Sequence, residues 1–101
     1  MQCARESCAA PARWYPVLLL FAPRRLFPHA PPARGICGVP VCDGHRDTVT
    51  LEDLLTDEGW LRIVTGFHAA RKAIPDRRDT RLEFIAIDSA EARAFRRGVE
   101  P

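Results

Sequence analysis

The nine residues 37–45, CGVPVCDGH, hold two of the chain's four cysteines and a histidine three residues after the second one. The other two cysteines are Cys3 and Cys8, in the segment CARESC at the start of the chain. Such a grouping is typical of a cysteine nucleophile with its base, of a disulfide framework or of a metal site. The choice among these three decides how the chain is stabilised.

The length and composition indicate one small globular domain. The chain has 101 residues, of which 47% are hydrophobic and 28% are charged, a balance typical of a folded protein. We therefore expect residues 1–101 to form a single domain. Because so short a chain buries a modest share of its surface, a crosslink or a metal ion would help to stabilise it.

No segment of the sequence has the pattern of a membrane span. The longest apolar run, VLLLFA at residues 17–22, is far shorter than the roughly 20 residues that a bilayer requires. A secretory signal is not predicted either, because Pro16 interrupts the candidate hydrophobic region and no small-x-small cleavage site follows it. We expect a cytoplasmic location and no membrane partner. In that compartment cysteines stay reduced, and grouped cysteines are typical of metal ligands.

The cysteine spacing predicts a zinc site. Zinc takes four sulfur or nitrogen ligands in a tetrahedron, and two short-spaced pairs on turns can supply them. Cys3 and Cys8 form the first pair, and we assign Cys42 and His45 as the second. Residues 36–41 look extended, and the following DGH can begin a helix. A cysteine that ends a strand and a histidine in the first helical turn then lie close enough to share one ion.

Cys37 is the alternative ligand. In that arrangement all four cysteines bind the ion, and His45 lies beside it or at the surface. Two interpretations without a metal are weaker. Cys3 and Cys8 flank the polar residues ARES, which a hydrophobic core would not accommodate, and disulfides are rare in the expected compartment.

The order of these features resembles a treble-clef-type zinc finger over roughly residues 1–65. The short-spaced cysteine pair is followed by APA, a strand (RWYPVLLLF), a loop, a second strand (GICGVPV) and a CxxH motif that opens a helix. The resemblance implies that a knuckle and a first helical turn flank a β-hairpin and bind zinc. The sequence departs from the family by a C-x4-C knuckle where C-x2-C is usual. The fold by itself implies no activity.

The predicted fold class is α+β. We expect a small zinc-stabilised β-hairpin with strands at residues 14–22 and 36–41, joined by the proline-rich loop 23–34. This hairpin module covers residues 1–56, and a helix–strand–helix extension covers residues 57–101.

A long helix opens the extension. In the stretch 56–75, TDEGWLRIVTGFHAARKAIP, apolar residues recur at helical spacing from Trp60 to Ile74. Pro75 is expected to end this helix.

Shorter elements surround that helix. Thr50 and Asp53 are spaced as a capping box before it. Residues 81–87, RLEFIAI, are predicted as a strand. Asp88 and Ser89 then cap a short final helix, AEARAFRR, which is expected to end at Gly98.

The sequence does not predict an enzyme. A catalytic zinc keeps an open position and has a base nearby, whereas this chain offers four or five ligands. Cys42 and His45 could instead act as nucleophile and base, but the other three cysteines would then have no explanation. We regard a hydrolase or transferase of this kind as the weakest alternative.

The expected function is that of a zinc-stabilised module that binds another protein, as an adaptor or inhibitor does. The loop 23–34 combines exposed-looking apolar residues with arginine, the composition of interface anchors. The candidate partner-binding residues are Arg24, Arg25, Leu26, Phe27 and Arg34. Arginines outnumber lysine fourteen to one in this sequence, which indicates a GC-rich genome, and we expect a bacterial or phage origin.

Nucleic acid is the alternative partner. Several arginines could form a basic face, and an aromatic side chain could stack on a base. The residues in question are Arg13, Arg24, Arg25, Arg34 and Arg46, with Trp14 or Tyr15. The formal net charge is only +2, so the strongly basic character of most nucleic-acid-binding domains is missing.

Overall fold

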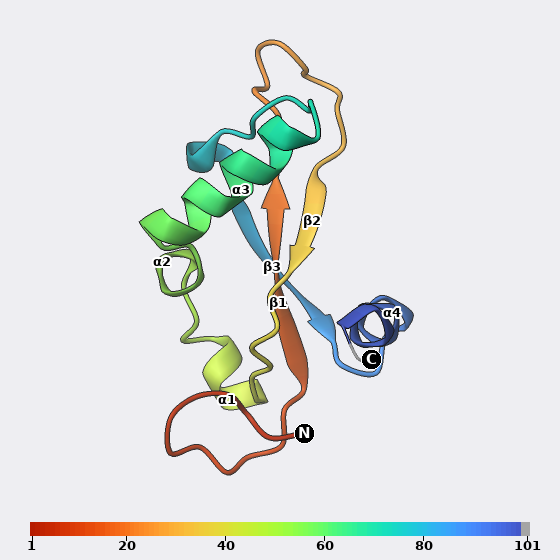
Figure 1. The fold of residues 1–101 in the computed structure, drawn as a ribbon. Coiled ribbons are helices and arrows are strands. Elements are labelled where there is room, and N and C mark those ends of the chain that lie inside the picture. The colour runs from red at the N-terminus through yellow and green to blue at the C-terminus, as the bar shows by residue number, and fades with distance from the viewer. Residues whose placement is uncertain (100–101) are drawn as a thin grey trace. The chain divides into compact units, whose positions relative to one another are not determined.

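The computed structural model describes residues 1–99 and confirms the α+β fold class. Over these residues a three-stranded antiparallel sheet is combined with four α-helices and one short 3-10 helix (Figure 1). The elements are β1 (Trp14–Leu20), β2 (Ala33–Ile36), α1 (Asp43–Arg46), α2 (Leu51–Leu54), α3 (Asp57–Ala69), η1 (Arg77–Asp79), β3 (Arg81–Ala86) and α4 (Ala90–Val99).

The first predicted strand lies in the centre of the sheet. The strand order is β2-β1-β3, so β1 is bonded on both edges (Figure 1). Its sequence, WYPVLLL, is apolar throughout, and five of its seven residues are buried. A central strand covered on both faces needs such a continuous apolar run rather than an alternating one. The expectation for residues 14–22 is therefore confirmed, with the strand ending two residues early.

The second strand differs from the prediction. It spans Ala33–Ile36, whereas we expected residues 36–41 to be extended as a strand. Pro40 has no N–H to donate to a sheet, and the ladder is interrupted before it. Pairing resumes at Val41, which forms an isolated antiparallel bridge with Trp14. The hairpin is therefore broken just before the cysteine that it was expected to position.

Capping residues start the helices as the sequence predicts. Thr50 and Asp53 form a complete capping box around α2. At α4, the Ser89 hydroxyl accepts a 3.1 Å hydrogen bond from the backbone N–H of Ala92. The helix α4 continues one residue past Gly98 to Val99.

The long helix is shorter than predicted. It ends at Ala69 rather than at Pro75, so Ile74 lies beyond it. The cause is a Schellman motif, in which Lys72 N–H donates to the Phe67 carbonyl and Arg71 N–H to that of His68. Arg71 has a φ of 56°, the left-handed conformation that this motif requires.

The chain divides into two compact units. Within residues 1–99, unit 1 consists of residues 1–17, 36–49 and 83–99, and unit 2 consists of residues 18–35 and 50–82. One hydrophobic cluster of unit 1 is built from Cys3, Val41 and Cys42, against which half-buried side chains including Cys8 pack. The three cysteines assigned as metal ligands are therefore packed within this cluster.

Candidate metal centre

Three cysteines and one histidine of unit 1 form a compact cluster. The ligand atoms of Cys3, Cys8, Cys42 and His45 all lie within 4.8 Å of one another. Cys3 and Cys42 are buried, and Cys8 and His45 are half-buried. These are the four residues that we assigned as ligands, and the structure brings them together from positions up to 42 residues apart.

Three ligand-atom distances in the cluster match those of a tetrahedral zinc site. With Zn–S and Zn–N bonds of about 2.3 Å and 2.0–2.1 Å, ligand atoms at the corners of a tetrahedron are about 3.8 Å apart for S···S and 3.5 Å for S···N. The Sγ atoms of Cys8 and Cys42 are 3.9 Å apart. His45 Nδ1 lies 3.4 Å from Cys3 Sγ and 3.3 Å from Cys42 Sγ. Both the donor set and its spacing therefore fit zinc.

The first two ligands lie on a tight loop. Cys3 N–H donates to the Ala10 carbonyl at 3.0 Å and closes this loop, and Cys8 N–H donates to the Arg5 carbonyl at 3.1 Å. Ser7, just before Cys8, has a φ of 62°. A non-glycine residue rarely adopts this left-handed conformation. The C-x4-C spacing is thus accommodated by one strained residue that turns the Cys8 side chain back toward Cys3.

The other two ligands lie at the start of α1. Cys42 is the N-cap of this helix, and its Sγ accepts the backbone N–H of His45 at 3.4 Å. Zinc thiolates are commonly stabilised by hydrogen bonds of this kind, because ligating groups are oriented by partners around them. The expectation that a cysteine and a histidine share one helical turn is confirmed.

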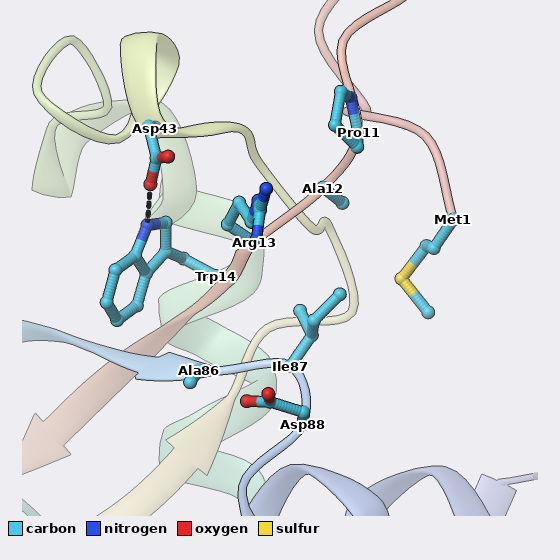
Figure 2. A pocket seen from close by; sticks show the side chains of 9 residues that line it. All are labelled: Met1, Pro11, Ala12, Arg13, Trp14, Asp43, Ala86, Ile87 and Asp88. Carbon is cyan, nitrogen blue, oxygen red and sulfur yellow. Dashed lines mark hydrogen bonds between the residues drawn. The ribbon is translucent and has the colours of Figure 1, made fainter.

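Side chains outside the cluster hold α1 in place. Nε1 of Trp14 donates a 2.7 Å hydrogen bond to Oδ1 of Asp43, as Figure 2 shows. Arg46 stacks on the Trp14 ring, with its Cζ 4.2 Å from the ring centre, and also lies 5.5 Å from the Phe84 ring centre. The sequence did not indicate these contacts, because Trp14 and Asp43 are 29 residues apart and no local pattern links them.

The thiols of the cluster have different proton affinities. Burial by itself raises the pKa of Cys3, but backbone hydrogen bonds from Arg5 and Cys42 and side-chain contacts with His45 and Cys8 lower it to about 6. A backbone hydrogen bond from Ala10 lowers the pKa of Cys8, yet burial and the neighbouring cysteines raise it overall. The Cys3 thiolate, the form that a metal binds, therefore forms at a lower pH than the Cys8 thiolate.

Cys37 lies outside the cluster. It directly follows β2, and its backbone N–H donates to the Pro16 carbonyl at 2.9 Å. Burial raises the pKa of its thiol. The structure thus leaves Cys37 outside the cluster that contains the other three cysteines. It favours the ligand set that includes His45.

The predicted partner-binding residues all belong to unit 2. Leu26 is 67% exposed and Phe27 is 46% exposed. Arg24, Arg25 and Arg34 are exposed as well. None of them contributes to the metal cluster.

Comparison with protein-family models, with curated proteins and with solved structures finds no match to this chain. Of the helices in residues 1–99, none has the length and apolar character needed to cross a membrane.

Proposed function

We propose that this chain is a non-catalytic module in which zinc stabilises a small scaffold for binding another protein, as in an adaptor or inhibitor. The observation that carries the proposal is the cluster of Cys3, Cys8, Cys42 and His45, with all four ligand atoms within 4.8 Å of one another. Zinc ligation needs reduced thiols, so the proposal includes a reducing compartment such as the cytoplasm.

The site is proposed to be structural because its four protein ligands fill a tetrahedron. A catalytic zinc has three protein ligands and leaves the fourth position to water or substrate. The Cys42–His45 pair could also be considered as nucleophile and base, since its Sγ···Nδ1 distance is 3.3 Å. However, the same Nδ1 also lies 3.4 Å from Cys3 Sγ. A nucleophile–base pair made of Cys42 and His45 alone does not explain why Cys3 lies so close.

A treble-clef-like layout is part of the proposal. Cys3 and Cys8 lie on a loop before the first strand, and Cys42 and His45 lie at the start of a helix after the second. This order supports the resemblance seen in the sequence. The longer knuckle, with Ser7 in a left-handed conformation, is the feature in which this chain would differ from the treble-clef family.

A protein partner is supported by the exposed apolar residues of the 23–34 loop. An aromatic stacking platform for nucleic acid is less well supported. Tyr15 is only 4% exposed, and Arg46 already covers a face of the Trp14 ring at 4.2 Å. Single-stranded nucleic acid is typically bound by aromatic faces that are open to the bases.

The first test is metal analysis of the purified protein. We expect one equivalent of zinc per chain, and we expect a strong chelator to lower the melting temperature of the protein. Cys8→Ser should lose the metal, whereas Cys37→Ser should retain it. Absence of zinc, or an unchanged melting temperature after its removal, would refute the proposal.

The second test addresses the protein partner. Tagged protein should capture a partner from cell extract, and Phe27→Ala should abolish this capture without changing the melting temperature. Leu61→Ala, which truncates a similarly exposed residue of α3, serves as the control. If Phe27→Ala lowers capture and melting temperature together, Phe27 is a structural residue and not an anchor.

A further inference from the structure

A hollow in unit 2 is lined by charged side chains beside the exposed apolar loop. Its volume is about 570 Å³. It is lined by Pro23, Arg24, Arg25, Asp76, Arg78 and Asp79. Asp76 N–H donates to the Phe21 carbonyl at 3.0 Å, and this bond holds the segment of η1 next to the start of the loop.

Two arginines of this hollow lack a carboxylate partner among residues 1–99. Oδ1 of Asp76 is already engaged by Arg78, through the backbone N–H at 3.0 Å and Nε at 3.6 Å. Asp79 is the other carboxylate that lines the hollow with Arg24 and Arg25. Unit 2 has nine basic and six acidic residues. The hollow and its surroundings therefore carry a positive charge that a partner can neutralise.

A turn orders the backbone at both arginines, and a ring contact orders the Arg24 side chain. The Pro23 carbonyl accepts the N–H groups of Leu26 and Phe27 at 3.0 Å and 2.9 Å, so Arg24 and Arg25 lie in one tight turn. The Arg24 guanidinium is also stacked on Phe21, 4.4 Å from the ring centre. Ordering before binding lowers the entropy that is lost on association.

Apolar side chains follow the arginines directly. Leu26 is 67% exposed and Phe27 is 46% exposed, both in the turn that presents Arg24 and Arg25. A partner that covers this surface needs carboxylates for the guanidinium groups and apolar side chains for the leucine and the phenylalanine. A planar guanidinium binds a carboxylate through two parallel hydrogen bonds.

We propose that the surface formed by Arg24, Arg25, Leu26 and Phe27 binds an acidic protein segment that presents both carboxylates and apolar side chains. This inference rests on the proposed protein-binding function and names the chemistry of the partner. Nucleic acid fits the surface less well, because Leu26 is exposed beside the arginines and a phosphate backbone offers it no apolar contact.

The experiment uses the zinc-loaded full chain and a short fluorescein-labelled peptide of alternating Glu and Leu. Fluorescence anisotropy measures binding at low and at physiological salt. The matched probes are the same peptide with Lys in place of Glu, and a single-stranded oligothymidine. We expect binding of the acidic peptide that weakens with added salt, and no binding of the lysine peptide.

Variants assign the binding to this surface. The double variant Arg24→Gln/Arg25→Gln should weaken acidic-peptide binding roughly tenfold or more, because two charge-assisted contacts are lost. Arg93→Gln, an exposed arginine of α4, should leave it unchanged. Leu26→Ala should weaken binding roughly three- to tenfold through lost apolar contact. Leu61→Ala, with 64% exposure against 67% for Leu26, should have no effect.

Two results would overturn the inference. The first is an acidic peptide that does not bind, or that binds the double variant as tightly as the native chain. The second is preferential binding of the oligothymidine through Arg24 and Arg25, which would identify a nucleic-acid surface. The proposed function fails separately, if the protein contains no zinc. If the variant Arg24→Gln/Arg25→Gln captures a partner as well as the native chain does, the acidic-segment proposal is rejected and the protein-binding function stands.

Discussion

The indole Nε1 of Trp14 donates a 2.7 Å hydrogen bond to Oδ1 of Asp43, and this bond ties the first residue of β1 to the helix that carries His45. Arg46 of the same helix stacks on the Trp14 ring at 4.2 Å. The helix α1 has only four residues, and so short a helix has little stability of its own. Its position, and with it the position of two proposed ligands, therefore depends on Trp14.

Replacing Trp14 should weaken zinc binding. Trp14→Phe removes the hydrogen bond to Asp43 but retains a ring on which Arg46 can stack. We expect the zinc dissociation constant to rise about fivefold, which corresponds to about 1 kcal/mol for one partly exposed hydrogen bond. Competition with a chromophoric chelator measures this constant.

A double-mutant cycle tests whether the effect passes through Asp43. Asp43→Ala should weaken zinc binding by a similar factor, and adding Trp14→Phe to it should cost little more. Fully additive effects of the two substitutions would show that the hydrogen bond does not position α1.

Relieving the strain in the ligand loop should stabilise the protein. Ser7 has a φ of 62°, a conformation that costs a non-glycine residue roughly 1–2 kcal/mol. Ser7→Gly should therefore raise the free energy of unfolding by about 1 kcal/mol and tighten zinc binding, as denaturation and chelator competition can measure.

Arg71→Gly is the matched control for that substitution. Arg71 has a φ of 56° at the end of α3 in unit 2. The variant should stabilise the fold by a similar amount but leave the zinc dissociation constant unchanged. Equal changes in zinc affinity in both variants would contradict a specific role for Ser7 in the ligand loop.

Cysteine substitutions should separate ligands from a packing residue. Cys8→Ser removes one of four thiolate or imidazole ligands and should weaken zinc binding by a factor of roughly a hundred or more. Cys37→Ser should leave zinc content unchanged, because Cys37 is not part of the cluster. Mass spectrometry of the native complex reads out both results, and metal loss in Cys37→Ser would favour the four-cysteine alternative.

Thiol alkylation of metal-free protein should depend on pH differently at Cys3 and Cys37. The pKa of Cys3 is lowered to about 6, whereas burial raises the pKa of Cys37. The thiolate is the reactive form, so the Cys3 rate should reach half of its maximum near pH 6 and level off at higher pH. Cys37 should react appreciably only at alkaline pH.

Brief labelling with iodoacetamide at low temperature, followed by peptide mass spectrometry, measures these rates. Bound zinc should protect Cys3 but not change the rate at Cys37. The prediction is contradicted if Cys3 titrates like an ordinary thiol while circular dichroism still shows the folded chain.

Local patterns were sufficient for most elements. The apolar run of β1, the capping box at Thr50 and the serine at residue 89 each act on their own neighbours along the chain, so their effects were predictable. The choice of Cys3, Cys8, Cys42 and His45 also came from spacing, because a ligand pair on one turn is a local arrangement. The prediction was wrong where the outcome was decided by backbone details, at the end of α3 and at the interruption of β2 before Val41.

What the sequence by itself determined is the α+β fold class and the grouping of cysteines with His45 that predicts a metal site. Tertiary structure alone decided that Cys37 is left out, that Trp14 holds α1 through Asp43, and that Asp76 lies beside the arginines of the 23–34 loop. The physical reason is the range of the interactions. Capping and periodicity act over a few residues, whereas these contacts join segments that become neighbours only when the sheet forms.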